Sequence, residues 1–430
     1  MSHSKIFKRI EGSICAPGGF KAAAVFCDIK KIGTGKGSEK GRKDDLALIV
    51  SDVPASAAGM FTTNQVRAAP VKVSARRATK NLARAIVVNS GNANACTGKQ
   101  GMGDAERMTK ITAKVLKLKS SDVLVCSTGR IGVPMPMKKV ERGIRACAPL
   151  LRRSTINARQ VAEAIMTSDT RRKEIAVEFK IGRSTVRIGG ICKGAGMIQP
   201  GMATMLAFLT TDAAIELNQL KRALKVAVEQ SFNRITVDGE MSTNDSVIML
   251  ANGLANNRRL DRVSPYRQRF QDAINHVCLE LAKMIVRDGE GVSRFITLHL
   301  RGARNAHEAE AAARAVANSS LVKTSWCGGD PNWGRILCAL GYSKAKVDVA
   351  IVDVGYAKPG SRKIILAFRR GRPTNVALKT LARISSAPEF DLHIDLHLGR
   401  SNFTMYASDL TEDYVAFNKG DVSDPASLGG

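Results

Sequence analysis

A threonine that follows a glycine-rich run is the feature of this sequence that most suggests chemistry. The run "CKGAGMIQPG" (192–201) leads through Met202 and Ala203 to Thr204, which opens an apolar stretch ending at residue 211. A hydroxyl is a weak nucleophile unless a base lies beside it. A threonine that begins a chain can use its own α-amine, whose pKa of about 7.7–8.0 leaves it partly neutral.

Such a threonine must be released from a precursor, in which the same hydroxyl can attack the preceding carbonyl. This route needs a small preceding residue, a glycine-rich approach that tolerates strain, and a strand that holds the threonine. Ala203 and Thr204 meet these conditions. Local features alone nevertheless favour a simpler interpretation, in which a loop enters a strand that happens to begin with threonine.

The elements that must position this threonine alternate between strands and helices. Apolar runs bounded by Gly, Asn and Asp predict strands, and apolar residues three or four apart predict amphipathic helices. Alternation over 174–192, with a turn at Gly182 and Arg183, predicts a hairpin. The expected strands are 46–52, 83–90, 121–128, 204–211, 246–253, 294–302, 346–354 and 363–370, and the expected helices are 104–118, 137–151, 217–232, 266–288 and one near 306–318.

The mixture predicts an α+β fold arranged as a layered sandwich, with neither a repeat nor a linker long enough to separate independent domains. Near the end of the chain, 390–399 and 402–410 alternate in polarity and are expected to form an antiparallel edge pair. The segment 30–45 is basic and glycine-rich. It lacks the residue order of a phosphate-binding loop, so we expect a solvated, mobile surface loop.

The charge of the chain is strongly positive. Its 430 residues include 66 Lys and Arg against 38 Asp and Glu, a net charge of +28, which attracts anionic partners such as nucleic acid, acidic lipid or carboxylate metabolites. The basic residues are spread along the chain, aromatic residues make up only 5%, and no motif of a nucleic-acid-binding module is present. We therefore expect a basic, solvated surface and no nucleic-acid partner.

The cysteines and histidines suggest structural roles. None of the nine cysteines forms a C-x-x-C pair, so they are most simply small buried side chains in a reducing compartment. The six histidines, among them His393 and His397 two alternations apart on one strand, match no Ser-His-Asp or metal motif, and we expect no bound metal. Without an evident signal peptide or a membrane-spanning run, the expected location is cytoplasmic, with no membrane partner.

Eight ordered blocks show that the sequence resembles the glutamate N-acetyltransferase (ornithine acetyltransferase) family of arginine biosynthesis. Each block alone is weakly specific, but the set covers nearly the whole chain. The blocks are "MFTTNQVRAAPV" (60–71), "VNSGNANACTG" (88–98), "STGRIGVPMPM" (127–137), "MTSDT" (166–170), "KGAGMIQPGMATML" (193–206), "SFNRITVDGEMSTND" (231–245), "IVRDGEG" (285–291) and "DPNWGRI" (330–336).

The resemblance implies self-cleavage between Ala203 and Thr204, giving an alpha chain, 1–203, and a beta chain, 204–430, which together form one catalytic unit. It also implies the layered α/β sandwich shared with self-processing aminopeptidases, and a dimer of two-chain units. The implied reaction transfers acetyl from N-acetylornithine to glutamate. Some family members also use acetyl-CoA, and the sequence leaves that donor open. No cofactor is expected, because the acyl group travels on Thr204.

The resemblance also assigns roles to individual residues. Thr204 is the nucleophile with its freed amine as base, and Thr128 and Gly129 form the oxyanion hole, since a hydroxyl and a backbone N–H can both face a developing oxyanion. A lysine suits the α-carboxylate of either amino acid, and a carboxylate suits the side-chain ammonium of ornithine. The implied substrate-binding residues are Thr167, Lys193, Thr204, Glu290, Asn418 and Ser423.

The sequence departs from the family pattern at three places. Arg130 stands where an apolar residue is common, Glu240 stands where Asp is common, and seven residues follow Ser423. Two other functions remain alternatives: a self-processed aminopeptidase or amidase of the same fold, with water as acceptor, and a basic nucleic-acid-binding protein.

Overall fold

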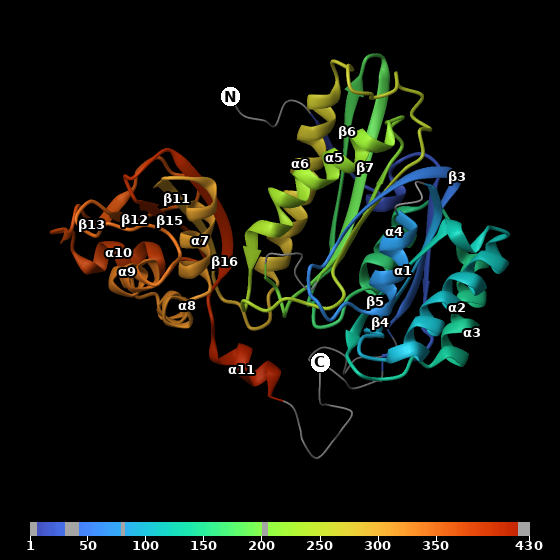
Figure 1. The fold of residues 1–430 in the computed structure, drawn as a ribbon, viewed down its shortest axis with the longest axis horizontal. Coiled ribbons are helices and arrows are strands. Elements are labelled where there is room, and N and C mark those ends of the chain that lie inside the picture. The colour runs from blue at the N-terminus through green and yellow to red at the C-terminus, as the bar shows by residue number, and fades with distance from the viewer. Residues whose placement is uncertain (1–6, 31–42, 79–81, 200–204, 420–430) are drawn as a thin grey trace.

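The protein consists of two lobes, each built on its own β-sheet. The computed structural model describes residues 7–30, 43–78, 82–199 and 205–419. The first lobe contains the elements from β1 to α6 except β9, and the second contains β9 and the elements from β11 to β16, with the two lobes side by side along the long axis of the molecule (Figure 1). Most of the basic insert predicted at 30–45 lies outside the described residues.

The first lobe contains a nine-stranded sheet in which β8 occupies a central place. The strand order is β1-β6-β7-β8-β10-β3-β4-β5, and β2 pairs with β3. β8 is antiparallel to β7 and parallel to β10. The strands are β1 (Lys8–Ile10), β2 (Phe20–Val25), β3 (Leu46–Phe61), β4 (Leu82–Asn92), β5 (Val123–Arg130), β6 (Lys173–Ile181), β7 (Ser184–Lys193), β8 (Leu206–Thr211) and β10 (Ser246–Ala251).

This sheet folds back on itself because β3 belongs to both of its halves. The pairing of β3 with β4 shifts between Val50 and Ala55, and the later part of β3 pairs with β10. Alternate residues of the two halves, such as Ile86 of β4 and Phe208 of β8, share one apolar core. The outward residues of each half pack against helices instead. The result is four layers, helix, strand, strand and helix, which confirms the predicted α+β sandwich (Figure 1).

Most helices of the first lobe cover the two outer faces of the folded sheet, while α4 (Thr155–Ala164) packs into the core between its halves. α5 and α6 pack on the half that contains β6, β7 and β8, while α1, α2 and α3 cover the half that contains β4 and β5. The helices are α1 (Ala69–Ala78), α2 (Gly98–Leu116), α3 (Met137–Cys147), α4 (Thr155–Ala164), α5 (Leu217–Glu229) and α6 (Arg267–Arg287).

The second lobe is a seven-stranded sheet with helices on one face. Its strand order is β14-β13-β12-β15-β11-β16-β9, and a single core joins the sheet to α7, α8, α9 and α10. The elements are β9 (Ile235–Thr236), β11 (Phe295–Ala303), β12 (Asp353–Ala357), β13 (Ile365–Arg369), β14 (Arg372–Pro373), β15 (Glu389–Asp395), β16 (Ser401–Ser408), α7 (Ala306–Ala317), α8 (Ser320–Cys327), α9 (Trp333–Gly341) and α10 (Leu378–Ser385). A further helix, α11 (Glu412–Asn418), follows β16.

Two expectations for this lobe were wrong. The segment 346–354 contributes a strand only from Asp353, and the residues before it form turns. The last two strands are not an antiparallel pair, because β11 lies between β15 and β16 and pairs with both. The predicted hairpin at 174–192 is confirmed, with β6 and β7 joined at Gly182 and Arg183.

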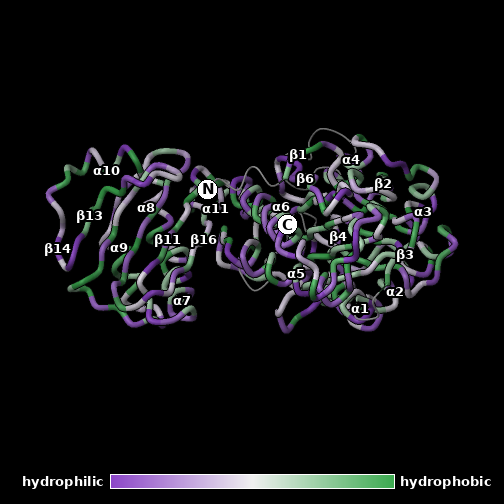
Figure 2. Tube along the Cα trace, turned by 90° about the horizontal axis from the view of Figure 1, so that it is seen from above, coloured by the Kyte–Doolittle hydropathy of each residue, from purple (hydrophilic) through white to green (hydrophobic). Residues whose placement is uncertain are grey.

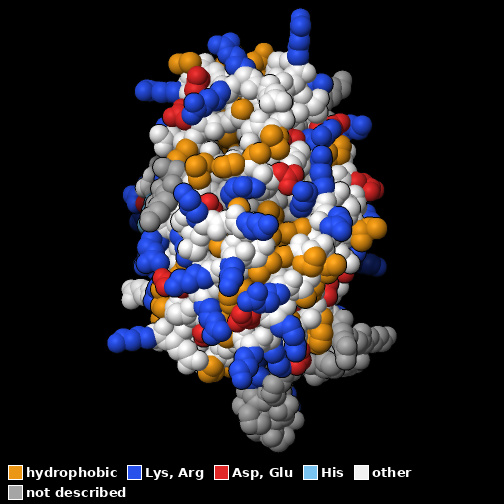
Figure 3. Space-filling model, turned by 90° about the vertical axis from the view of Figure 1, so that its right-hand side faces the viewer, with side chains coloured by type: hydrophobic (Ala, Val, Ile, Leu, Met, Phe, Trp, Pro, Cys, Tyr) orange, Lys and Arg blue, Asp and Glu red, His pale blue; other side chains and the backbone are white. Residues whose placement is uncertain are grey.

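The face of the first lobe seen in Figure 3 is basic without one dominant patch. Lys and Arg side chains are dispersed over the face of the first lobe seen in Figure 3, with apolar side chains between them. Polar and apolar stretches alternate along the trace of both lobes (Figure 2). Within the described part of the chain, every helix is too short or too polar to cross a membrane. Six of the nine cysteines are buried, and all nine are free thiols.

Candidate active site

Six of the predicted site residues are described by the structure. Thr128 and Gly129 end β5, Lys193 ends β7, Thr167 follows α4, Glu290 follows α6, and Asn418 ends α11. The other three, Ala203, Thr204 and Ser423, lie outside the described residues. The described residues nearest to the predicted cleavage position are Gln199 on one side and Met205 on the other.

The predicted oxyanion pair lies where β5 meets an irregularity in β4. Thr128 is buried, and Gly129 has a φ of +128°. A Cβ atom on Gly129 would come within 2.3 Å of the carbonyl carbon of Gly91. Only glycine fits such a close backbone approach at positive φ. The glycine of "STGRIG" is thus required by local geometry, whatever its part in chemistry.

Two consecutive residues connect the start of β8 to the end of β5. The backbone N–H of Met205 donates to Asp245 Oδ1 at 2.8 Å. The side-chain amide of Asn244 donates to the carbonyl of Ser127 at 2.8 Å and to that of Ala93 at 2.7 Å. Met205, which follows the predicted nucleophile, and Ser127, which precedes the predicted oxyanion pair, are therefore held by two consecutive residues of the chain. Sequence analysis assigned Asn244 and Asp245 no role, although both lie in a matching block.

A buried carboxylate joins two predicted substrate-binding residues. Asp169 accepts the backbone N–H of Thr167 at 3.0 Å, and its other oxygen accepts that of Gly194 at 2.7 Å. The ammonium of Lys193 lies 3.9 Å from Asp169 Oδ2, with both side chains almost fully buried. Asp169 thereby orients the backbone on both sides of the site. The sequence contained it in "MTSDT" but gave no signal that it reaches Lys193.

The same carboxylate belongs to a buried ionic cluster. The ammonium of Lys173 lies 2.6 Å from Asp169 and 2.5 Å from Asp288. Burial opposes the charge on Asp169, but Lys173 and Lys193 outweigh it and lower the pKa of that carboxyl below its usual range. Asp288 also accepts the backbone N–H groups of Thr170 and Arg171. The cluster therefore fixes the loop between α4 and β6.

Lys193 is a buried charged residue that interacts electrostatically with three carboxylates. Burial lowers the pKa of Lys193, while the carboxylates of Asp169, Glu290 and Asp245 oppose that shift. In the ladder between β7 and β8 it lies opposite Leu206, two residues beyond the predicted nucleophile. A buried ammonium in this position can bind an incoming carboxylate.

The second pair of predicted substrate-binding residues is in direct contact. The side-chain amide of Asn418 donates to Glu290 Oε2 at 3.0 Å. The backbone N–H of Glu290 donates to the carbonyl of Ala195 at 2.9 Å. A Cβ atom on Gly196 would come within 2.4 Å of the Glu290 carboxylate carbon. The glycine-rich run thus leaves room for this carboxylate, and α11 closes over it.

Two of the three departures from the family pattern are described by the structure and differ in exposure, whereas the tail after Ser423 lies outside the described residues. Arg130 is half-buried at the end of β5, and its carbonyl accepts the N–H of Ala93. Glu240 is exposed, and its backbone N–H donates to Asp238. Nothing in the structure explains the choice of side chain at either position.

Comparison with known proteins identifies the family of this chain. The model of the ArgJ family matches residues 22–420. The chain is 46% identical over 409 residues to the arginine biosynthesis bifunctional protein ArgJ of Symbiobacterium thermophilum, covering 95% of this chain and 98% of that one. It is also 46% identical over 410 residues to the ArgJ protein of Geobacter sulfurreducens, covering 93% and 98%.

A crystal structure of the arginine biosynthesis bifunctional protein ArgJ from Bacillus halodurans aligns with part of the chain. The alignment has a TM-score of 0.46 and 39% identity and covers 49% of this chain and 97% of that one. The family match and the near full-length relatives do not depend on that alignment. The chain belongs to the ArgJ family.

Proposed function

We propose that this protein is a glutamate N-acetyltransferase of arginine biosynthesis, which moves acetyl from N-acetylornithine to glutamate. The family match over residues 22–420 carries the proposal, and the near full-length relatives are named arginine biosynthesis bifunctional proteins. The described residues add buried charges suited to amino-acid substrates, with Lys193 and Glu290 close enough for their charges to interact.

The reaction runs in two halves through Thr204. Self-cleavage after Ala203 frees the α-amine of Thr204, which accepts the hydroxyl proton as the oxygen attacks the acetyl carbonyl of N-acetylornithine. The amine returns that proton to the departing nitrogen, so that ornithine leaves and the acetyl ester remains on Thr204. In the second half, the amine of glutamate attacks this ester and regenerates the hydroxyl. The Thr128 hydroxyl and the Gly129 N–H stabilise the oxyanion in both halves.

Charge complementarity supports the choice of substrates. Lys193 pairs with the α-carboxylate that N-acetylornithine and glutamate share, and Thr167 lies beside it through Asp169. Glu290 pairs with the side-chain ammonium of ornithine. Asn418 donates a hydrogen bond to the carboxylate of Glu290 and holds that carboxylate in place. Ser423, which the family resemblance also assigns to substrate binding, lies outside the described residues. One pocket thus serves donor and acceptor in turn, as a double-displacement mechanism requires.

Acetyl-CoA is a second candidate donor, because the relatives are named bifunctional. The assembly that we propose is a dimer of units, each made of the 1–203 and 204–430 chains. An aminopeptidase or amidase of the same fold would hand the acyl group to water instead.

The decisive experiment supplies purified protein with glutamate and either N-acetylornithine or acetyl-CoA and quantifies acetylglutamate from each. With N-acetylornithine alone, the fragment that begins Thr-Met-Leu-Ala should gain the mass of one acetyl group, and Thr204→Ala should stay uncleaved and inactive. Release of free acetate without acetylglutamate would favour the hydrolase. Ornithine that appears only when glutamate is present, with no acetyl on the fragment, would exclude Thr204 as an acyl carrier.

A further inference from the structure

The second lobe holds a cluster of metal-ligating side chains that the proposed reaction does not use. His299 of β11 and His393 of β15 are direct partners in a parallel ladder, and Asp391 lies two residues before His393. Because side chains alternate between the faces of a sheet, all three project from the same face. The residues between them, such as Leu298 and Leu392, point to the other face and pack beneath the helices.

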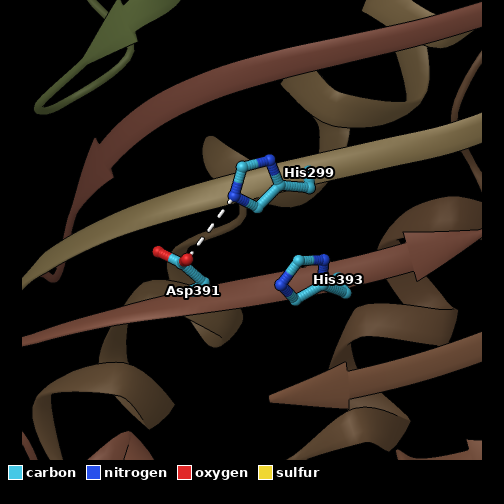
Figure 4. Close-up of side chains that lie close together, drawn as sticks. All are labelled: His299, Asp391 and His393. Atoms are coloured by element: carbon cyan, nitrogen blue, oxygen red, sulfur yellow. Dashed lines mark ion pairs between the residues drawn. The ribbon is translucent and has the colours of Figure 1, made fainter. Parts of the chain in front are cut away.

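The three side chains direct ligand atoms of the right kinds toward one another. One nitrogen from each histidine and one oxygen of Asp391 all lie within 4.8 Å of one another. His299 Nε2 is 3.7 Å from Asp391 Oδ2, and the two imidazole rings are stacked at 4.6 Å. Figure 4 shows the His299 nitrogen facing the carboxylate, with the His393 ring beside it on the same side of the strands.

His393 is half-buried, and its two ring nitrogens lack hydrogen bonds within the part of the chain that the structure describes. Both of its ring nitrogens are buried and find no partner among the described residues. A buried polar group without a partner is costly, so a ligand for these nitrogens would remove a penalty.

A backbone hydrogen bond orients the carboxylate of Asp391. Asp391 accepts the backbone N–H of Gly360 at 2.8 Å. Such an outer hydrogen bond is a usual feature of metal-binding carboxylates.

We infer that His299, Asp391 and His393 form a binding site for a divalent transition metal, with zinc as the best fit. Two imidazoles and one carboxylate are a common zinc ligand set that leaves a fourth position for water. The His299 side chain is 26% exposed, so water can reach that position. Three ligand atoms that lie at most 4.8 Å apart are all within about 2.8 Å of a common point. The side chains would therefore move inward by up to about 0.7 Å to reach the roughly 2.0–2.1 Å of a Zn–N bond.

The site would tie β11 to β15 at the centre of the second sheet. Its ligands lie on strands different from those that hold Thr128 and Lys193, so the inference does not rest on the proposed acetyl transfer. The sequence gave no sign of this site, because it placed His393 beside His397. The structure instead puts His397 beyond the end of β15, and His299, from far away in the chain, becomes the neighbour of His393.

The test is titration of the full-length, chelator-treated protein with zinc sulfate by calorimetry, with thermal unfolding alongside. Wild type should bind one zinc per chain, and zinc at about 100 times its Kd should raise Tm by about 3 °C. His393→Gln and Asp391→Asn should weaken binding at least tenfold, because each removes one ligand. His397→Gln is the matched control: its Nε2 is 3.0 Å from Asp353, outside the cluster, and binding should be unchanged.

Cobalt provides a second measurement that does not depend on variants. Bound Co²⁺ should give a visible absorption band without thiolate charge transfer, which separates this site from binding by the exposed Cys96 or Cys338. Circular dichroism would verify that each variant is folded. Absence of stoichiometric binding by wild type, a thiolate band, or unchanged affinity in His299→Gln/His393→Gln would overturn the inference.

Discussion

Asp169 and Asp288 allow a test of which buried carboxylate serves the active site and which serves only the fold. Both contact the ammonium of Lys173, at 2.6 and 2.5 Å, and both are buried. Asp169 also holds the backbone of Thr167 and Gly194. Asp288 instead holds Thr170 and Arg171. Replacing each by asparagine removes one charge but keeps the shape of the side chain.

Both substitutions should cost similar stability. Each loses a charge-assisted hydrogen bond to Lys173, worth about 1.5–3 kcal/mol, while the other carboxylate still pairs with that lysine. A chain of 430 residues unfolds with an entropy of about 0.9 kcal/mol/K, at roughly 2.1 cal/mol/K per residue. Each variant should therefore melt about 2–3 °C below wild type by differential scanning calorimetry.

Their effects on activity should differ. In Asp169→Asn the new amide faces a backbone N–H donor, so the backbone near Thr167 or Gly194 must move, and Lys193 loses a nearby charge. If this displacement weakens transition-state stabilisation by the same 1.5–3 kcal/mol, kcat/KM for N-acetylornithine should fall by about 10- to 150-fold. Asp288→Asn should stay within about threefold of wild type. Equal activity of the two processed, folded variants would refute the reasoning.

Three further results are expected. Gly129→Ala should greatly reduce acetyl transfer because its Cβ would meet the Gly91 carbonyl carbon at 2.3 Å, whereas Gly132→Ala, also at positive φ but with open space around it, should retain activity in the same assay. Asn418→Ala should raise KM for N-acetylornithine by about 2- to 10-fold with kcat nearly unchanged, because it removes one hydrogen bond to Glu290; an unaltered KM would contradict this role. The pKa of Asp169 is lower in the fold than in the unfolded chain, so its contribution to stability is present above about pH 4 and is lost as the pH falls further. The range from pH 5 to pH 3 brackets the unfolded-state pKa of about 3.9. Over that range the Tm of Asp169→Asn should therefore decrease less steeply than the Tm of wild type.

Local patterns predicted those parts of the fold in which neighbours along the chain are also neighbours in space. The hairpin of β6 and β7 is such a case, since its alternation and its turn at Gly182 specify the pairing. The alternation over 346–354 was misleading, because polarity alone does not provide a strand with a partner, and pairing with β15 begins only at Asp353. The order of β15, β11 and β16 likewise depends on contacts between distant segments.

The same limit applies to the candidate site. The matching blocks gave the positions of Lys193 and Glu290, and the family resemblance near the end of the chain gave that of Asn418. The contact between Glu290 and Asn418 supports their grouping. They did not reveal that Asp288 lies beside Lys173, 115 residues earlier in the chain. A buried ion pair of this kind leaves no spacing signal, because either partner alone resembles an ordinary surface charge.

The place of β8 bears on how the protein regains its structure after denaturation. β8 and β10 belong to the segment after residue 204, yet they lie between β7 and β3, which belong to the segment before it. Cleavage between Ala203 and Thr204 would leave two polypeptides interleaved in one sheet, unable to part without unfolding it. An uncleaved chain refolds as a single molecule, but a cleaved one must find its partner, so its recovery should depend on protein concentration. Processing would then turn a unimolecular folding reaction into a bimolecular one, so that the uncleaved precursor is the form that folds independently of protein concentration.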